Sequence, residues 1–396
     1  MDVKGRQLTL VERWELDIKS AHKDMDVKTS TPQCKRCKYF IKGNALNCER
    51  YLEEKKPREV MFCHKECNNY ESDNVLNVKI TDDEASRLFG GVFGFCVGDM
   101  LGVPVEFSTR EQRDIDNVKE LRAYGTYHQP FGTWSDDTSL MLCLIDAFNK
   151  GYSEYLLASN FVKFYKEGFY TPHGKVFDIG IATQNAIEKI IEGVNLAECG
   201  GKEERDNGNG SLMRVLPIAF AGKNLDDLKF IEMVENISAI THAHSRAKLA
   251  CIFYVKFAMQ LILGKDKTEA YNDTITFINK NCYEKYSDEF NTFGTILNRE
   301  IIHFNRNNIK STGYVIDTLE AVLWTFFNSK SYDEMVLNAV NLGGDTDTIA
   351  AIVGGLGGIY YGFESIPNRW VQNVCRKNEI YEMVNDFYEM IKNKKG

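Results

Sequence analysis

Small residues recur every fourth position in two apolar segments of this chain, and this spacing restricts the fold more than any other feature. One stripe is Gly90, Gly94, Gly98 and Gly102, and the other is Ala350, Gly354, Gly358 and Gly362. Residues four apart lie on one face of an α-helix. Glycine inside a helix costs about 0.5–1 kcal/mol relative to alanine, so its repeated use indicates that another backbone or a ligand approaches each face closely. We therefore expect two helices that pack tightly at the core of a bundle.

Helical periodicity dominates the chain from residue 80 onward, and the apolar runs do not alternate with period two. The segments that favour helix are 82–102, 137–150, 153–167, 176–193, 211–221, 226–240, 244–263, 267–280, 286–299, 313–328, 331–340, 347–362 and 376–392. The sequence predicts an all-α domain over 80–396, built as a compact multi-helix bundle.

The first 79 residues differ in composition, being polar and dense in cysteine, so we place a domain boundary near residue 80. Paired cysteine spacing of this kind is typical of a small zinc-binding module. The candidate ligands for Zn²⁺ are Cys34, Cys37, Cys48, Cys63 and Cys67. A reduced, metal-free segment is the alternative. The cysteines after residue 90 are scattered, and we expect them to be reduced packing residues.

Charge and hydropathy exclude several classes of protein. A formal net charge of −8 over 396 residues gives no general basic field, so general nucleic-acid binding is not expected. Uninterrupted apolar stretches stay below the roughly 18–20 residues of a membrane span, and Asp99 interrupts the first glycine-rich segment. No membrane partner is expected. The N-terminal residues lack the apolar core of a signal peptide, which predicts a cytoplasmic location.

Two acidic pairs with hydroxyl neighbours precede predicted helices, as Ser135-Asp136-Asp137-Thr138 and as Asp345-Thr346-Asp347-Thr348. A single acid at such a position is commonly a helix cap. The second acid of each pair is then left without a structural role. Carboxylate and hydroxyl oxygens are hard ligands, which suit Mg²⁺ or Mn²⁺ better than Zn²⁺ or Cu²⁺. If the two clusters meet in space, they can hold two metal ions.

An ordered set of motifs resembles the ADP-ribosylglycohydrolase family, which includes the dinitrogenase reductase activating glycohydrolase. The motifs are Gly98 to Phe107, Ser135 to Thr138, Gly208 to Arg214, Thr241 to His244 and Gly343 to Thr348. The resemblance covers roughly residues 82–370. It implies an all-α fold, two Mg²⁺ or Mn²⁺ ions, and hydrolysis of the N- or O-glycosidic bond that links ADP-ribose to a protein side chain or another acceptor.

The resemblance also implies roles for individual residues. The metal ligands would be Ser135, Asp136, Asp137, Asp345, Asp347 and Thr348. Ser135 stands where the family usually has threonine, and the ligating hydroxyl is kept. Glu106 matches the acidic residue near the reacting bond, and Asp178 matches a residue that helps to hold ADP-ribose.

The pyrophosphate of ADP-ribose is expected at Asn209, Gly210 and Ser211, because this loop leads into a predicted helix whose free N–H groups attract anions. The family motif also contains two histidines. Spacing leaves open whether His242 or His244 faces the pocket, and we name His242 as the substrate-binding candidate.

The implied reaction is attack of water on the anomeric carbon of the terminal ribose, with Asp137 or Glu106 as the base. Both candidates stay open. The expected partner is an ADP-ribosylated protein or a small ADP-ribosyl conjugate, although segments 108–133 and 196–207, which shape the acceptor side, carry no recognisable motif. Two alternative functions are an ADP-ribose-binding module without turnover and a two-metal phosphoester hydrolase.

Overall fold

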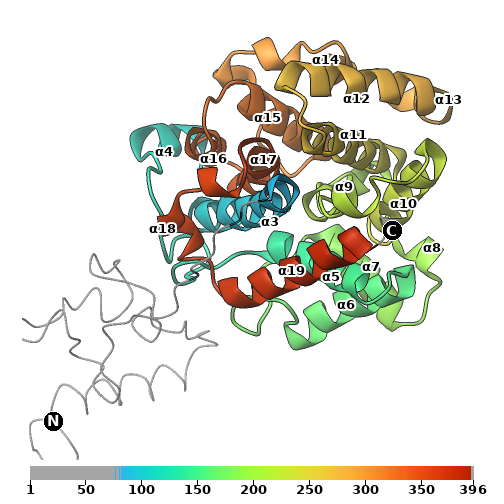
Figure 1. Ribbon diagram of the computed structural model, residues 1–396, viewed down its shortest axis with the longest axis horizontal. Coiled ribbons are helices and arrows are strands. Elements are labelled where there is room, and N and C mark those ends of the chain that lie inside the picture. Colours follow the sequence, from blue (N-terminus) through green and yellow to red (C-terminus); the bar gives the residue numbers. More distant parts are fainter. Residues whose placement is uncertain (1–75, 77–79, 81, 394–396) are drawn as a thin grey trace, which may run out of the picture.

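The two stripes of small residues lie against each other at the centre of the molecule. In the computed structural model, which describes residues 76, 80 and 82–393, α3 (Asp83–Gly102) and α17 (Thr346–Tyr361) run antiparallel and side by side (Figure 1). A Cβ atom added to Gly98 would lie 2.0 Å from the carbonyl oxygen of Ala350, and equivalent contacts recur along both stripes. Only glycine fits at such distances. The predicted tight packing of these two helices is confirmed.

Secondary structure in the described residues is helical, with isolated β-bridges and no strand, so the all-α prediction is confirmed. The other α-helices are α4 (Arg110–Ile115), α5 (Asp136–Asn149), α6 (Glu154–Glu167), α7 (Ile181–Ile191), α8 (Leu196–Cys199), α9 (Ile218–Ala221), α10 (Asp227–Ala239), α11 (Ser245–Ile262), α12 (Lys267–Asn281), α13 (Tyr283–Tyr286), α14 (Gly294–Leu297), α15 (Val315–Phe327), α16 (Tyr332–Val340), α18 (Asn368–Val371) and α19 (Lys377–Asn393). The 3₁₀ helices are η2 (Val103–Val105), η3 (Glu204–Asp206), η4 (Leu212–Arg214), η5 (Ser287–Glu289), η6 (Ile301–His303), η7 (Arg306–Asn308) and η8 (Phe363–Ser365).

Three predicted helices differ from the structure. The segment 211–221 is not one helix, because Pro217 has no N–H to continue the ladder and restricts the residue before it; η4 and the single turn α9 form instead. The segment 286–299 is also broken, and Glu289 turns inward to bond Arg246 at 2.7 Å. In the segment 176–193, helix α7 begins only at Ile181, after an extended stretch.

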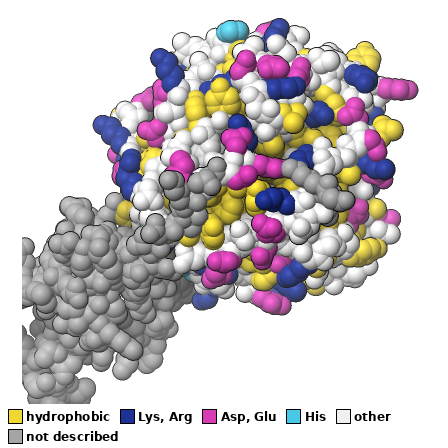
Figure 2. Space-filling model, in the orientation of Figure 1, with side chains coloured by type: hydrophobic (Ala, Val, Ile, Leu, Met, Phe, Trp, Pro, Cys, Tyr) yellow, Lys and Arg dark blue, Asp and Glu magenta, His cyan; other side chains and the backbone are white. Residues whose placement is uncertain are grey.

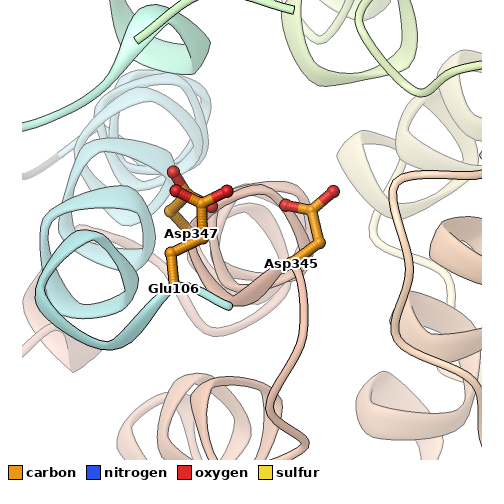
Figure 3. A group of neighbouring side chains, drawn as sticks. All are labelled: Glu106, Asp345 and Asp347. Carbon is orange, nitrogen blue, oxygen red and sulfur yellow. The ribbon is translucent and has the colours of Figure 1, made fainter. Parts of the chain in front are cut away.

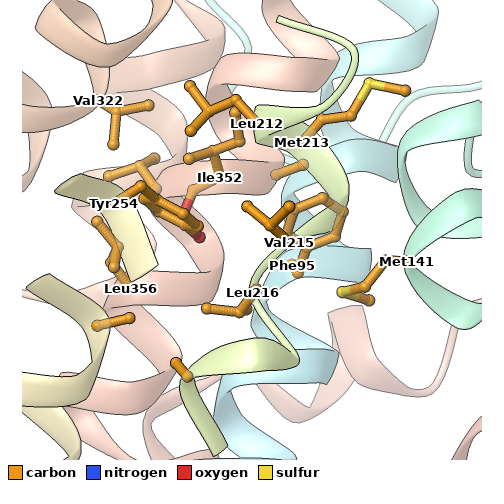
Figure 4. Close-up of a cluster of buried hydrophobic side chains, with 14 of the residues drawn as sticks. Phe95, Met141, Leu212, Met213, Val215, Leu216, Tyr254, Val322, Ile352 and Leu356 are labelled. Atoms are coloured by element: carbon orange, nitrogen blue, oxygen red, sulfur yellow. The ribbon is translucent and has the colours of Figure 1, made fainter. Parts of the chain in front are cut away.

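A continuous hydrophobic core surrounds α3 and α17. Figure 4 shows part of it, where Phe95 of α3, Ile352 of α17 and Leu216 of the connection before α9 meet. Tyr254 of α11 is buried there and donates its hydroxyl to the carbonyl oxygen of Ile352 at 3.1 Å. The core thereby holds the central helix pair against its neighbours, and with it the end of α3 and the start of α17.

One helical stretch in the described part of the chain, Asp83–Val105, is long and apolar enough to cross a membrane, and 94% of its apolar window is buried inside the protein. It is the central core helix. On the face seen in Figure 2, basic and acidic side chains are interspersed over the surface. The six cysteines between residues 82 and 393 are buried, as expected for packing residues.

The predicted zinc ligands Cys34, Cys37, Cys48, Cys63 and Cys67 lie outside the described residues. Near the predicted domain boundary, Leu76 is bound to the all-α domain through the Gln372 side chain. Its N–H donates to Gln372 Oε1 at 2.8 Å, and its carbonyl oxygen accepts from Gln372 Nε2 at 2.7 Å.

Candidate active site

The two acidic helix starts meet in one buried cluster. Thr348, in the first turn of α17, donates its hydroxyl to Asp137 Oδ2 at 3.3 Å, and Ser135 donates to the same oxygen at 3.1 Å. Asp137 and Asp347 are both almost completely buried. The structure therefore brings together side chains that are about two hundred residues apart in the chain, as the paired motifs predicted.

A buried carboxylate of α3 holds the start of α5. Asp99 Oδ1 accepts from the N–H of Ser135 at 2.9 Å, and Asp99 Oδ2 accepts from the N–H and hydroxyl of Thr138 at 3.0 and 2.7 Å. Burial raises the pKa of Asp99 to about 6. This residue was not named as a site residue from the sequence. The available signal was a lone acid inside an apolar helix, because such a carboxylate needs hydrogen-bond donors from elsewhere.

The start of α17 is set by its backbone. Gly343 and Gly344 have φ values of +73° and +74°, a left-handed conformation that favours glycine. The N–H of Gly344 donates to the Ser108 carbonyl oxygen at 2.8 Å, and the N–H of Asp345 donates to the Ser311 carbonyl oxygen at 2.9 Å. Asp345 makes no side-chain cap bond to α17. Its carboxylate is consequently available to the cluster.

Glu106 completes the cluster from the loop after η2. Figure 3 shows Glu106, Asp345 and Asp347 on the same side of the first turn of α17, and one carboxylate oxygen from each lies within 4.8 Å of the others. The position of Glu106 is fixed by its neighbour Phe107, whose N–H donates to the Gly344 carbonyl oxygen at 2.8 Å. The loop that carries Glu106 and the loop that leads into α17 are thus joined directly.

Burial and mutual repulsion raise the pKa of the clustered carboxyls. Burial raises the pKa of Asp136, Asp137 and Asp347 well above its usual range. Burial, with the added charges of Asp178 and Asp345, raises the pKa of Glu106 to about 9. Like charges held together out of water favour protonation unless a cation is present. The cluster therefore has the electrostatic character of a cation site.

The donor set fits divalent cations that prefer oxygen. Glu106 Oε2 and Asp137 Oδ1 are the two carboxylate oxygens in the described residues that are buried without a hydrogen-bond partner. Buried oxygens of this kind need a donor or a cation. Carboxylates and hydroxyls suit Mg²⁺ and Mn²⁺. Glu106, Asp345 and Asp347 can therefore hold such an ion, and the roles of Ser135, Asp136, Asp137, Asp345, Asp347 and Thr348 as the ligands of two ions stay predictions.

Asp178 lies beside the cluster in the extended stretch before α7. Burial, with the charge of Asp345, raises the pKa of Asp178. The Tyr127 hydroxyl opposes this rise, as it does for Glu106. The backbone N–H of Gly180 lowers the pKa of Asp136, so the stretch before α7 lies close to the start of α5. Tyr127 belongs to a loop without sequence signal and was missed.

The loop 208–211 differs from its prediction in one respect, because it leads into the short 3₁₀ helix η4 and not into an α-helix. The N–H of Asn209 donates to the Gly313 carbonyl oxygen at 3.0 Å. Its side-chain amide donates to Asp345 Oδ2 at 2.7 Å and to Thr318 Oγ1 at 2.9 Å. Asn209 therefore positions a predicted metal ligand from inside the protein. The buried Ser211 hydroxyl accepts from Ser238 at 2.9 Å.

His242 and Arg214 pack beneath this loop. The His242 ring is so close to Gly210 that a Cβ there would lie 2.8 Å from it. Burial, with the charge of Arg214, lowers the pKa of His242 to about 3, so its imidazole is neutral at neutral pH. Arg214 is fully buried and donates to the Gly210 carbonyl oxygen. His244 instead caps α11 through Arg246 N–H at 3.1 Å. The substrate-binding roles of Asp178, Asn209, Gly210, Ser211 and His242 stay predictions.

Comparison with known proteins places this fold and site in a family. The ADP-ribosylglycohydrolase family profile matches residues 80–396. The ADP-ribosylarginine hydrolase Tri1 of Pseudomonas putida is 30% identical over 78% of this chain and 80% of its own length. The ADP-ribosyl-[dinitrogen reductase] glycohydrolase of Rhodospirillum rubrum is 28% identical over 74% and 92%. A solved ADP-ribosylglycohydrolase-related protein complex superposes with a TM-score of 0.64 at 26% identity, covering 78% of this chain and 99% of that one. The chain belongs to the ADP-ribosylglycohydrolase family and is a hydrolase.

Proposed function

We propose that this protein removes ADP-ribose from arginine side chains of modified proteins, in a reaction that depends on Mg²⁺ or Mn²⁺ at a two-ion site. The observation that carries the proposal is the buried cluster in which two carboxylate oxygens, Glu106 Oε2 and Asp137 Oδ1, have no partner. Two similar proteins, from Pseudomonas putida and Serratia proteamaculans, are named ADP-ribosylarginine hydrolases, which favours arginine as the acceptor.

In this proposal the ions would be held between the two helix starts. Asp136 and Asp137 would hold them from the start of α5, together with Asp345 and Asp347 from the start of α17. Bound divalent cations would supply positive charge that orients the vicinal hydroxyls of the terminal ribose and lowers the pKa of water. The protein contributes rigidity, since Asp99 and the Gly343-Gly344 backbone fix both helix starts before a ligand arrives.

The reaction breaks the bond between the anomeric carbon and the guanidine nitrogen and forms a bond from that carbon to a water oxygen. Positive charge develops on the sugar ring, and nearby carboxylates stabilise it. The water loses a proton and the leaving nitrogen gains one, so no other reactant is needed. Glu106 or Asp137 would accept the proton from water, and the unpartnered oxygen of each supports this role.

A direct test uses a protein that is ADP-ribosylated on arginine, with Mg²⁺ and with a chelator, beside simple phosphate esters. We expect ADP-ribose to be released with Mg²⁺, not with the chelator, and phosphate esters to be left intact. Binding of ADP-ribose without release would favour the binding-module alternative. Cleavage of phosphate esters alone would favour a two-metal phosphoester hydrolase.

A further inference from the structure

Three aromatic rings from three separate loops lie in a row beside the carboxylate cluster. The centroids of Phe107 and Tyr127 are 6.4 Å apart with an interplanar angle of 61°, and those of Tyr127 and Phe177 are 5.2 Å apart at 57°. Phe107 is 68% exposed, an unusual state for so large an apolar side chain. We call Phe107, Tyr127 and Phe177 the aromatic row.

Two rings of the aromatic row are next to acidic residues of the site in the sequence. Phe107 follows Glu106 directly, and Phe177 precedes Asp178. The Tyr127 hydroxyl lowers the pKa of both carboxyls, those of Glu106 and Asp178, against the larger effect of burial. The charges that act most strongly on Glu106 are themselves acidic, Asp178 and Asp345. The edge of the site therefore combines the exposed ring of Phe107 with acidic side chains that ionise when a cation is bound beside them, and both features favour a cation.

Backbone strain indicates that Phe107 is held in place for a ligand. Its φ of +62° is rare for a bulky residue, and such conformations cost of the order of 1–3 kcal/mol. An exposed ring recovers little of this cost through burial. The N–H of Phe107 donates to the Gly344 carbonyl oxygen, so the strained conformation is tied to the loop that leads into α17. The backbone of Phe107 consequently has a fixed position relative to the loop that carries Asp345.

We infer that the aromatic row is the acceptor subsite, and that it binds the guanidinium of the arginine from which ADP-ribose is removed. A guanidinium is flat, always charged and weakly hydrated, so it stacks on aromatic faces better than an ammonium does. Glu106 and Asp178 supply complementary charge at the edge of the stack. The inference rests on the proposed function for its choice of acceptor, and it assigns specificity to residues outside the metal cluster.

The test measures guanidinium binding directly, without turnover. Agmatine is titrated calorimetrically into the full-length protein with Mg²⁺ and saturating ADP-ribose, and ADP-ribose is titrated separately. Phe107→Leu removes the π face and keeps most of the apolar volume, so we expect agmatine affinity to fall roughly 3- to 30-fold. Affinity for ADP-ribose should change less than about twofold, and Phe107→Trp should restore agmatine binding. Tyr155→Leu, on α6, is the matched control, because Tyr155 is 76% exposed.

Unchanged agmatine affinity in Phe107→Leu, or a parallel loss of ADP-ribose affinity, would overturn the inference. A second measurement is the melting temperature of Phe107→Gly, which we expect to rise because glycine relieves the positive φ; a fall would assign the ring to stability instead. If agmatine binds as expected while the arginine-linked substrate stays intact, the proposed function fails and the subsite stands.

Discussion

The starts of α5 and α17 present the same kind of acidic pair, and they are built by different means. The start of α5 is held by a carboxylate from another helix, since Asp99 accepts three hydrogen bonds from Ser135 and Thr138. The start of α17 is held by its own backbone, through two left-handed glycines and hydrogen bonds to neighbouring loops. The difference teaches that a buried carboxylate can be positioned by side chains or by main-chain geometry. Each mode is sensitive to a different kind of substitution.

The largest effect is expected when the proposed two-ion site between the two helix starts loses a carboxylate. Asp347→Ala removes a clustered carboxylate, and we expect hydrolysis to fall by about 10³-fold or more, because electrostatic stabilisation of the transition state depends on the ions. The protein should stay folded and, with a chelator, melt at the same or a higher temperature, because a like charge is removed. Rates are measured at limiting Mg²⁺. Full activity under that condition would end the two-ion proposal.

The side-chain mode is broken by Asp99→Asn. The new amide presents N–H groups to backbone donors, so we expect a loss of about 2–4 kcal/mol in the free energy of unfolding and about 10²-fold in the rate per folded molecule. Asp146→Asn is the matched control, since Asp146 is also buried and accepts from Tyr170 and Asn160 at 2.7 and 3.0 Å. It should lose stability without that loss of rate. Equal rate losses in the two variants would show that Asp99 is merely structural.

The backbone mode is broken by Gly344→Ala. A Cβ there would lie 2.0 Å from the Ser311 carbonyl oxygen, at a φ of +74°. We expect the Mg²⁺ concentration for half-maximal rate to rise about 10-fold, as for other disturbances of ligand orientation. Gly151→Ala separates the clash of the added Cβ from the strain of a positive φ. Gly151 has a φ of +85° and nothing within 4 Å of the added atom. That control should lose about 1–2 kcal/mol of stability from the left-handed conformation alone, with an unchanged Mg²⁺ titration.

The smallest effect tests whether the α5 start uses its hydroxyl as a ligand. Ser135 accepts from the Asp137 N–H at 3.2 Å, so its removal costs about 1 kcal/mol as a lost cap. Ser135→Ala should also raise the Mg²⁺ requirement several-fold, by about 3- to 10-fold, whereas Ser135→Thr should be tolerated. A Mg²⁺ titration that is unchanged in the alanine variant would leave the hydroxyl with a capping role only.

Local features of the sequence were sufficient for most of the helices and for the acidic pairs. Repeated glycine predicted the α3–α17 contact, and caps followed by apolar periodicity predicted α5, α6 and α10 nearly to the residue. The failures have a physical reason in each case. Pro217 divided a predicted helix through a local restriction that the apolar pattern concealed. In the other broken segment, Glu289 bonds Arg246, a contact between segments distant in sequence that the apolar pattern does not reveal.

The sequence by itself determined which carboxyl and hydroxyl groups stand at the two helix starts, because capping and periodicity act over a few residues. Only the tertiary structure decided which groups surround them. Asp99 reaches Ser135 from another helix, Asn209 turns its amide to Asp345, and Phe107 meets Tyr127 at the edge of the site. These relations depend on the packing of segments that are far apart in the chain, and capping and periodicity do not report on such packing.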